Sequence, residues 1–143
     1  MPTELELAKL LYPKAWEAAQ KYAAENPGTG NILDHAKALQ QYGEESYLIA
    51  LKRCGESPGT GTVWDHGETL VKYAPAYGAA LQAAKANPNT GSVLDHAVMM
   101  VRFPEAYGRA LAACKAHPEK GDVRKCGLLL LKEESESAHP PAS

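Results

Sequence analysis

The chain has 143 residues, of which 45% are hydrophobic, 22% are charged and 7% are aromatic. This composition is typical of one globular domain and not of a disordered chain. The formal net charge is only −2 at pH 7, so the chain lacks the basic excess that non-specific nucleic-acid binding requires. It also lacks an apolar run of about 18 residues, which excludes a membrane-spanning helix.

The first dozen residues predict a single leading helix. Thr3 and Glu6 have the spacing of a capping box, in which each residue satisfies a free backbone N–H of the other. The segment MPTELELAKLLYP is acidic early and has no basic n-region or cleavage site, so we expect no signal peptide. The cysteines are odd in number and lack metal-ligand spacing, which favours reduced thiols and a cytoplasmic location: Cys54, Cys114 and Cys126.

A nine-residue motif then occurs three times. It reads PGTGNILDH at residues 27–35, PGTGTVWDH at 58–66 and PNTGSVLDH at 88–96, so the period is 31 and then 30 residues. A fixed period of this length is the signature of a repeat array. Aromatic residues keep the same register at Trp16, Tyr47, Tyr77 and Tyr107. We therefore expect four units, at about 13–43, 44–73, 74–103 and 104–133.

Each unit has the pattern of two helices. In the first, Tyr77, Ala80, Leu81 and Ala84 follow the i, i+3, i+4, i+7 spacing of an amphipathic helix. A Pro-x-x-Gly loop ends it. The second helix opens at a good N-cap residue in every unit: Asn31, Thr62, Ser92 and Asp122.

One position in the second helix is always small: Ala36, Gly67, Ala97 and Gly127. It predicts a close contact between helices. Because the links between helices are short, consecutive helices must be antiparallel neighbours. The predicted fold is all-α: an α-solenoid of four helix-turn-helix repeats after a leading helix, about nine helices in residues 1–133. The polar, Pro-rich segment 134–143 predicts a disordered C-terminal tail.

Two-helix units of this length resemble α-solenoid repeats. Unit four, PEAYGRALAACKAHPEKGDVRKCGLLLLKEE, resembles the short HEAT-like repeats of phycobilin-lyase proteins in its Pro-Glu-Ala start, its Ala-Leu pair and its Asp-Val-Arg at 122–124. The phrase ALQAAKANPNT in unit three is similar to the end of a tetratricopeptide repeat. Both resemblances imply a curved surface presented to a protein or peptide, and neither implies a reaction or a cofactor.

The repeated Asp-His pairs are the strongest candidates for chemistry. Asp34, Asp65 and Asp95 stand three residues after an N-cap, where an acidic side chain accepts free N–H groups and meets the positive helix end. The pattern therefore predicts capping. Adjacent residues on a helix point about 100° apart, so Asp and His do not form a catalytic pair within one motif.

The histidines leave alternatives open. His35, His66 and His96 lie at the edge of the apolar stripe, which favours half-buried imidazoles bonded to the backbone or loop of a neighbouring unit. A histidine ladder that binds a ligand is the second interpretation. A shared metal is the weakest, because stacked helices lie about 10 Å apart and zinc ligands about 2 Å from the ion. If the histidines are buried and neutral, stability should be lower at pH 5 than at pH 7.

Three other features have simple structural interpretations. Cys54 and Cys114 share a register with alanines and predict small buried thiols. Trp64 replaces a leucine, so it predicts a core residue or an interface contact. The recurring loops form a row that predicts either plain chain reversals or a binding edge.

Function is predicted at the level of class. The first hypothesis is a non-enzymatic scaffold that binds a protein or peptide, or a second copy of itself, on a concave face. That contact region would contain His35, His66, His96, Trp64, Asp65, Glu68 and Val98. The alternative is an enzyme or lyase-like accessory that uses one histidine as general base with Asp65 or Glu68. No metal, cofactor, nucleic acid or membrane partner is expected.

Overall fold

The computed structural model describes residues 3–138, and every regular element in that range is helical. Eight α-helices follow one another: α1 (Glu4–Leu11), α2 (Trp16–Glu25), α3 (Ile32–Glu56), α4 (Val63–Lys72), α5 (Tyr77–Ala86), α6 (Val93–Arg102), α7 (Tyr107–Ala116) and α8 (Val123–Ala138). Two short 3₁₀ helices, η1 (Ala74–Ala76) and η2 (Pro118–Lys120), precede α5 and α8. The all-α prediction is confirmed.

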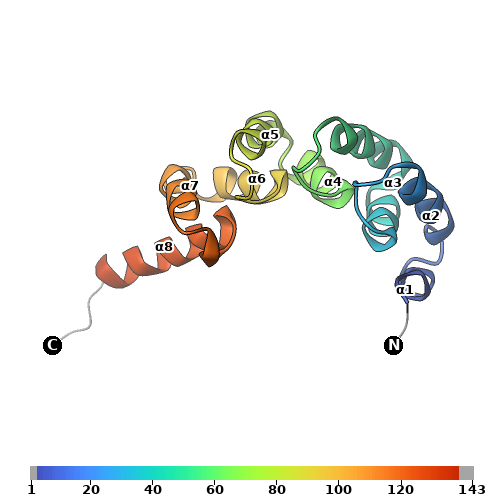
Figure 1. Ribbon diagram of the computed structural model, residues 1–143, viewed down its shortest axis with the longest axis horizontal. Helices are drawn as coiled ribbons and strands as arrows, with labels where there is room; N and C mark the ends of the chain where they lie inside the picture. Colours follow the sequence, from blue (N-terminus) through green and yellow to red (C-terminus); the bar gives the residue numbers. More distant parts are fainter. Residues whose placement is uncertain (1–2, 139–143) are drawn as a thin grey trace.

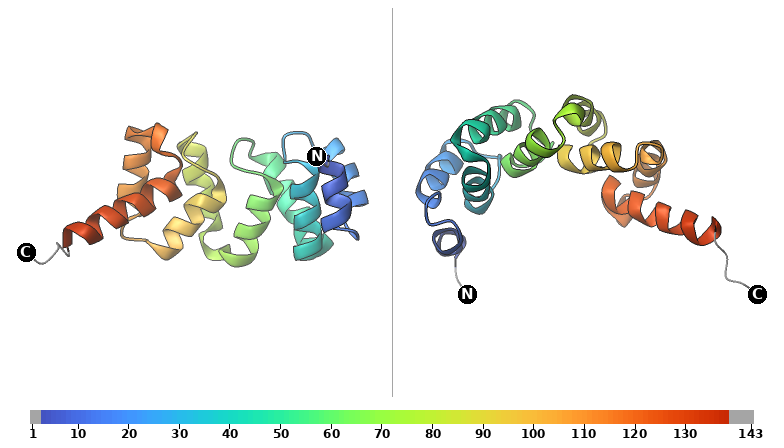
Figure 2. Two further views of the ribbon diagram at one scale, coloured as in Figure 1. Left: turned by 90° about the horizontal axis from the view of Figure 1, so that it is seen from below. Right: turned by 180° about the vertical axis from the view of Figure 1, so that it is seen from behind.

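The helices form two layers along an arch (Figure 1). The inner, concave layer contains α1, the first half of α3, α4, α6 and α8. The outer, convex layer contains α2, the second half of α3, α5 and α7, and the views in Figure 2 agree with this division. The two ends of the described chain lie at opposite feet of the arch. Along the inner layer, α4 contacts α6 and α6 contacts α8.

The predicted count of nine helices differs from the eight α-helices in residues 3–138. The reason is that α3 runs across the boundary between units one and two. Gly43, with φ +85° and ψ 165°, is non-helical and divides α3 into two segments. The first segment is the second helix of unit one, and the other is the first helix of unit two. No loop is needed there, because one glycine at positive φ turns the chain.

The predicted C-terminal tail was wrong for residues 134–138, which continue α8 to Ala138. The segment KEESE is rich in good helix formers, and Glu134 forms an ion pair with Arg109 of α7 at 2.7 Å. Residues 139–143 of the predicted tail lie outside the described residues.

Close approach between helices explains the small residue in each second helix. A Cβ added at Gly67 would lie 3.1 Å from the ring of Tyr42. One added at Gly127 would lie 3.1 Å from the Cβ of Ala110. Ala36 and Ala97 are fully buried at the same register. The predicted close contact is confirmed, and it allows consecutive units to share small, separate apolar clusters in place of one large core.

Backbone hydrogen bonds also join consecutive units through the loops. The first N–H of each second helix donates to a carbonyl in the preceding unit's loop: Val63 to Thr29, Val93 to Thr60 and Val123 to Thr90, each at 2.7 Å. Ile32 has no such loop before it and donates instead to the Glu4 carboxylate of α1 at 2.5 Å. The loops therefore stack as a row along one edge of the arch.

Candidate functional site

The aspartates of the repeated motif cap the second helices. Asn31, Thr62 and Ser92 each accept from the N–H of the aspartate three residues later, and that aspartate accepts from the N–H of the cap. For Asp65 this return bond measures 2.9 Å. The predicted capping role is confirmed. Burial is the largest effect on Asp65 and raises the pKa of its carboxyl, and the bonds from Thr62 partly oppose it.

The leading helix has a simpler cap than the sequence predicts. Thr3 accepts from the N–H of Glu6 at 3.2 Å, which is half of a capping box. The neighbouring Glu4 carboxylate instead reaches Ile32 across the first helix contact. The second hydrogen bond of the predicted capping box is therefore replaced by a bond between α1 and α3.

Each histidine of the motif is bonded at both ring nitrogens. The Nε2 atoms of His35, His66 and His96 lie 2.9 Å from the hydroxyl oxygens of a loop threonine: Thr29, Thr60 and Thr90. The Nδ1 atoms lie 2.5, 2.8 and 2.6 Å from the hydroxyl oxygens of Tyr47, Tyr77 and Tyr107 in the next unit. We call each set a Thr–His–Tyr cluster. It ties a loop, its second helix and the following first helix together.

The proton positions in these clusters follow from the hydrogen-bond network. In the middle cluster, the Thr60 hydroxyl donates to the Ser57 carbonyl at 2.6 Å, so its oxygen is left to accept from His66 Nε2–H. His66 Nδ1 then accepts from the Tyr77 hydroxyl. The other clusters have the same arrangement, with Asn26 and Asn87 supplying the carbonyls. This assigns a neutral Nε2–H imidazole in all three clusters.

Burial moves the pKa values of the histidines and tyrosines in the clusters further from pH 7. It lowers the pKa of His66 to about 4, because a charged imidazole would lose its hydration. The pKa values of His35 and His96 are also lowered by burial, and neighbouring aspartates partly oppose the shift. Burial raises the pKa of Tyr77 and of Tyr107 to about 12. All partners are therefore neutral in the folded protein.

The expectation of half-buried histidines was wrong, because all three are 0% exposed. The position beside the apolar stripe predicts that one side of each ring is buried. The tyrosine of the next unit covers the other side, which the stripe does not predict. In this structure none of the three imidazoles can touch a partner, a ligand or a substrate. Their shared role is to fix the loops and the distance between units.

The threonine and tyrosine members of the clusters were not predicted from the sequence as partners of the histidines. A signal was available in the sequence. Threonine, histidine and tyrosine occur as a set at the same spacing three times, and all three are replaced at the fourth set of equivalent positions. Unit four has Lys120 for the threonine and Cys126 for the histidine, and Ser137 stands 30 residues after Tyr107. Three polar residues that appear and disappear as a set indicate direct contact.

Removing one hydroxyl tests the clusters directly. In Tyr77→Phe, the buried Nδ1 of His66 loses its donor, and an unsatisfied buried acceptor costs about 1–3 kcal/mol. We expect the free energy of unfolding in urea at pH 7 to fall by that amount. Tyr73→Phe is the matched control, because the Tyr73 ring packs beside the same apolar cluster and its hydroxyl has no hydrogen-bond partner in residues 3–138. Equal stability of the two variants would contradict the role assigned to Tyr77.

The other predicted contact residues differ in how far they are buried. Trp64 is half-buried on α4, stacks on Tyr42 with ring centroids 5.2 Å apart, and holds Lys37 Nζ 3.9 Å from its ring centroid. Glu68 is buried beneath this group, bonded to the Tyr42 hydroxyl and 2.6 Å from Lys72 Nζ. Val98 is buried on α6. Of these residues, only Trp64 and the half-buried Asp65 offer surface to a partner.

The cysteines at shared register are buried, as predicted. Cys54 donates to the Gly61 carbonyl at 3.4 Å, and Cys114 donates to the Gly121 carbonyl at 3.2 Å. Burial raises the pKa of each thiol to about 11, so the reactive thiolate is scarce at neutral pH. These thiols help to hold the loop ends.

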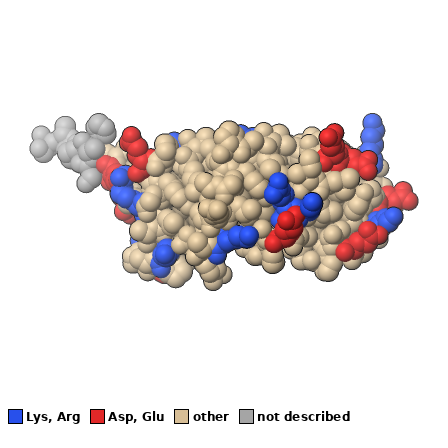
Figure 3. Space-filling view, turned by 90° about the horizontal axis from the view of Figure 1, so that it is seen from above, with Lys and Arg blue, Asp and Glu red and all other residues tan. Residues whose placement is uncertain are grey.

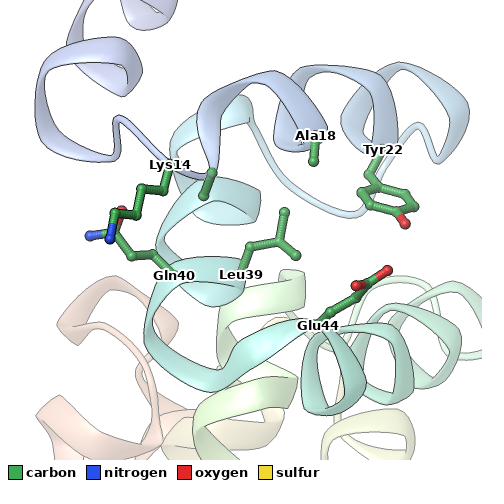
Figure 4. A pocket seen from close by; sticks show the side chains of 7 residues that line it. Lys14, Ala18, Tyr22, Leu39, Gln40 and Glu44 are labelled. Carbon is green, nitrogen blue, oxygen red and sulfur yellow. The ribbon is translucent and has the colours of Figure 1, made fainter.

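A surface pocket of about 370 Å³ lies between α2 and the two segments of α3 (Figure 4). Leu39 forms part of its floor, with Lys14 and Gln40 at one end and Tyr22 and Glu44 at the other. Its lining contains no histidine, cysteine or serine. The pocket is an opening beside the turn at Gly43.

Residues 3–138 contain no group of three or more histidine, cysteine or acidic side chains arranged to hold a metal ion. Within that range no helix is both long and apolar enough to cross a bilayer. Comparisons with protein-family models, with curated proteins and with solved structures find no match.

Proposed function

We propose that the chain is a non-enzymatic α-solenoid scaffold of HEAT-like two-helix repeats, which binds a protein or peptide on its concave face. The observation that carries this proposal is the contrast between the two faces. The inner helices expose Val71 on α4 and Val101 on α6, and Trp64 on α4 is half-buried. An inner helix has neighbours on both sides and an outer helix behind it, so its uncovered side chains face the concavity.

The convex face offers less to a partner. Figure 3 looks onto it and shows charged side chains mainly near its ends and along one edge, with an uncharged middle. Exposed residues of α5 and α7 are either small, such as Gly78 and Ala112, or polar, such as Arg109 and Lys115, and none is a large apolar residue. Small side chains bury little apolar area on binding. Larger exposed apolar residues of the outer layer are confined to Leu48 and Ile49 of α3.

The chemistry of the concave face suggests the kind of partner. Lys72 and Arg102 are exposed and follow Val71 and Val101 directly in α4 and α6. Lys37 adds a cation above Trp64. Apolar side chains next to basic ones fit a segment that carries apolar residues and acidic groups together. The buried thiols favour a cytoplasmic location for this scaffold.

The enzymatic alternative is less well supported by the same geometry. A general base must reach the proton that it abstracts. His35, His66 and His96 are covered and bonded at both nitrogens, so access would require separation of two units. The proposal therefore assigns the histidines to architecture and binding to the surface above them.

The test compares two double variants in affinity capture from native extract. The concave variant is Val71→Glu with Val101→Glu, and the convex control is Leu48→Glu with Ile49→Glu, which removes the same kind of apolar surface. We expect a partner that the wild-type chain and the convex control retain and that the concave variant loses, with binding weakened about tenfold or more, which corresponds to about 1.4 kcal/mol. Capture that is unchanged by the concave variant would overturn the proposal.

A further inference from the structure

The last inner helix exposes two positions that are buried on α4 and α6. On α6, Val98 is 3% exposed and Met99 0%, and Met99 packs against Ala110 of α7 and Val123 of α8. On α8, thirty residues later in the same register, Leu128 is 52% exposed and Leu129 47%. These leucines lie where a fifth unit would sit. Two adjacent large apolar residues, left open on a surface that is otherwise an interface, indicate a missing neighbour.

Basic residues surround this open face. A groove of about 400 Å³ is lined by Lys120, Lys125, Leu128, Leu129 and Lys132. Lys120 stands at the position that is equivalent to the loop threonines of the earlier units. In the three earlier contacts, the carbonyl of that threonine accepts a hydrogen bond from the first N–H of the next unit's second helix. The C-terminal face is therefore apolar at its centre and positive at its rim. We call it the α8 end face.

The opposite end of the array has complementary chemistry. The leading helix α1 exposes Leu10 (77%) and Leu11 (53%). Its first turn carries Glu4, which is bonded to the Ile32 N–H, and Glu6, which is exposed, and its last turn carries the exposed Lys9. Glu6 and Leu10 are four residues apart, so they share one face of α1. We call this surface the α1 end face. It combines Leu10 with the carboxylate of Glu6, whereas the α8 end face combines Leu128 and Leu129 with lysines.

We propose that copies of the chain associate end to end, with the α1 end face of one copy packed on the α8 end face of another. This contact continues the helix stacking that already joins α4 to α6 and α6 to α8 within one chain. The two end faces lie at opposite feet of the arch (Figure 1), so they meet only between molecules. The contact is heterologous: each copy presents one face of each kind, and rings or chains form.

Reciprocal variants test this arrangement in solution. The C-end variant is Leu128→Glu with Leu129→Glu, and the N-end variant is Glu6→Lys with Leu10→Lys. All four residues are exposed, so both variants should keep the wild-type helix content by circular dichroism. By sedimentation velocity over a range of concentrations, we expect wild-type species heavier than the 15.3 kDa chain. Each variant alone should remain a monomer. An equimolar mixture should form a dimer, because one intact face of each kind is present.

Three outcomes would overturn the inference. The first is a wild-type chain that stays monomeric at every concentration. The second is an N-end variant that still self-associates while the C-end variant does not, since this would mean an α8–α8 contact. The third is a mixture that forms no dimer. The concave variant Val71→Glu with Val101→Glu should still associate end to end, so failure of the scaffold proposal and failure of this one are distinguishable.

Discussion

Between pH 7 and pH 5 the folded protein should lose about 2 kcal/mol of stability or more. An unfolded histidine titrates near pH 6.5, whereas burial lowers the folded pKa of His66 to about 4. Below pH 6.5 the unfolded chain therefore binds more protons than the folded chain, and stability falls as pH falls toward 4. His66 alone contributes roughly 2 kcal/mol of this loss at pH 5. His35 and His96 act in the same direction, since burial lowers their pKa values too.

The measurement is the free energy of unfolding in urea at the two pH values. Asp65 works in the opposite direction, because its folded pKa is raised above the unfolded value. Asp65 is unchanged in the variant below, so the comparison with the wild-type chain isolates the histidine. His66→Gln should reduce the difference between the two pH values. A free energy of unfolding that is independent of pH would show that the clusters are not closed in solution.

Gly61→Ala should destabilise the protein by about 3 kcal/mol or more. Gly61 has φ +129°, which L residues rarely adopt, and a Cβ there would lie 2.8 Å from Asp65 Oδ2 and 2.9 Å from the Ser92 Cβ. The substitution would push the loop away from both its own capping box and the next unit's cap. Loss of the stacked loops should follow, because Val93 donates to Thr60 next to this position.

The neighbouring Gly59 provides a matched control in the same loop. It also has positive φ, at +83°, but no atom lies within 4 Å of an added Cβ. Gly59→Ala should cost only the conformational strain of a left-handed residue, about 1–2 kcal/mol. The two alanine variants therefore separate backbone strain from crowding between units. If urea unfolding gave the same loss for both, the close approach of the loops would not contribute to stability.

Local features of this fold were predictable because their causes lie within a few residues. The capping boxes at Asn31, Thr62 and Ser92 depend on residues three apart. The helix starts at Trp16, Tyr77 and Tyr107 and the small residue at Gly67 follow from a period that the sequence repeats. The buried thiol of Cys54 also follows, because its register partners are alanines.

The candidate site was predicted less well. The Asp-His pair draws attention to the histidines, but an imidazole at the edge of an apolar stripe can be open or covered, and the stripe alone does not decide. The covering group is Tyr77 for His66, eleven residues away in the next unit. Its ring reaches the imidazole only after two helices and a loop have packed.

The amino-acid sequence by itself determined the period, the caps and the all-helical class, because these depend on spacing and on backbone groups within one turn. The tertiary structure decided three things that depend on contacts between units. The turn at Gly43 lies within α3 and not between two separate helices. The histidines are buried between threonine and tyrosine hydroxyls. Leu128 and Leu129 remain exposed on α8. Burial is a property of neighbouring helices in space, and a one-dimensional pattern fixes it only where the neighbours are also close along the chain.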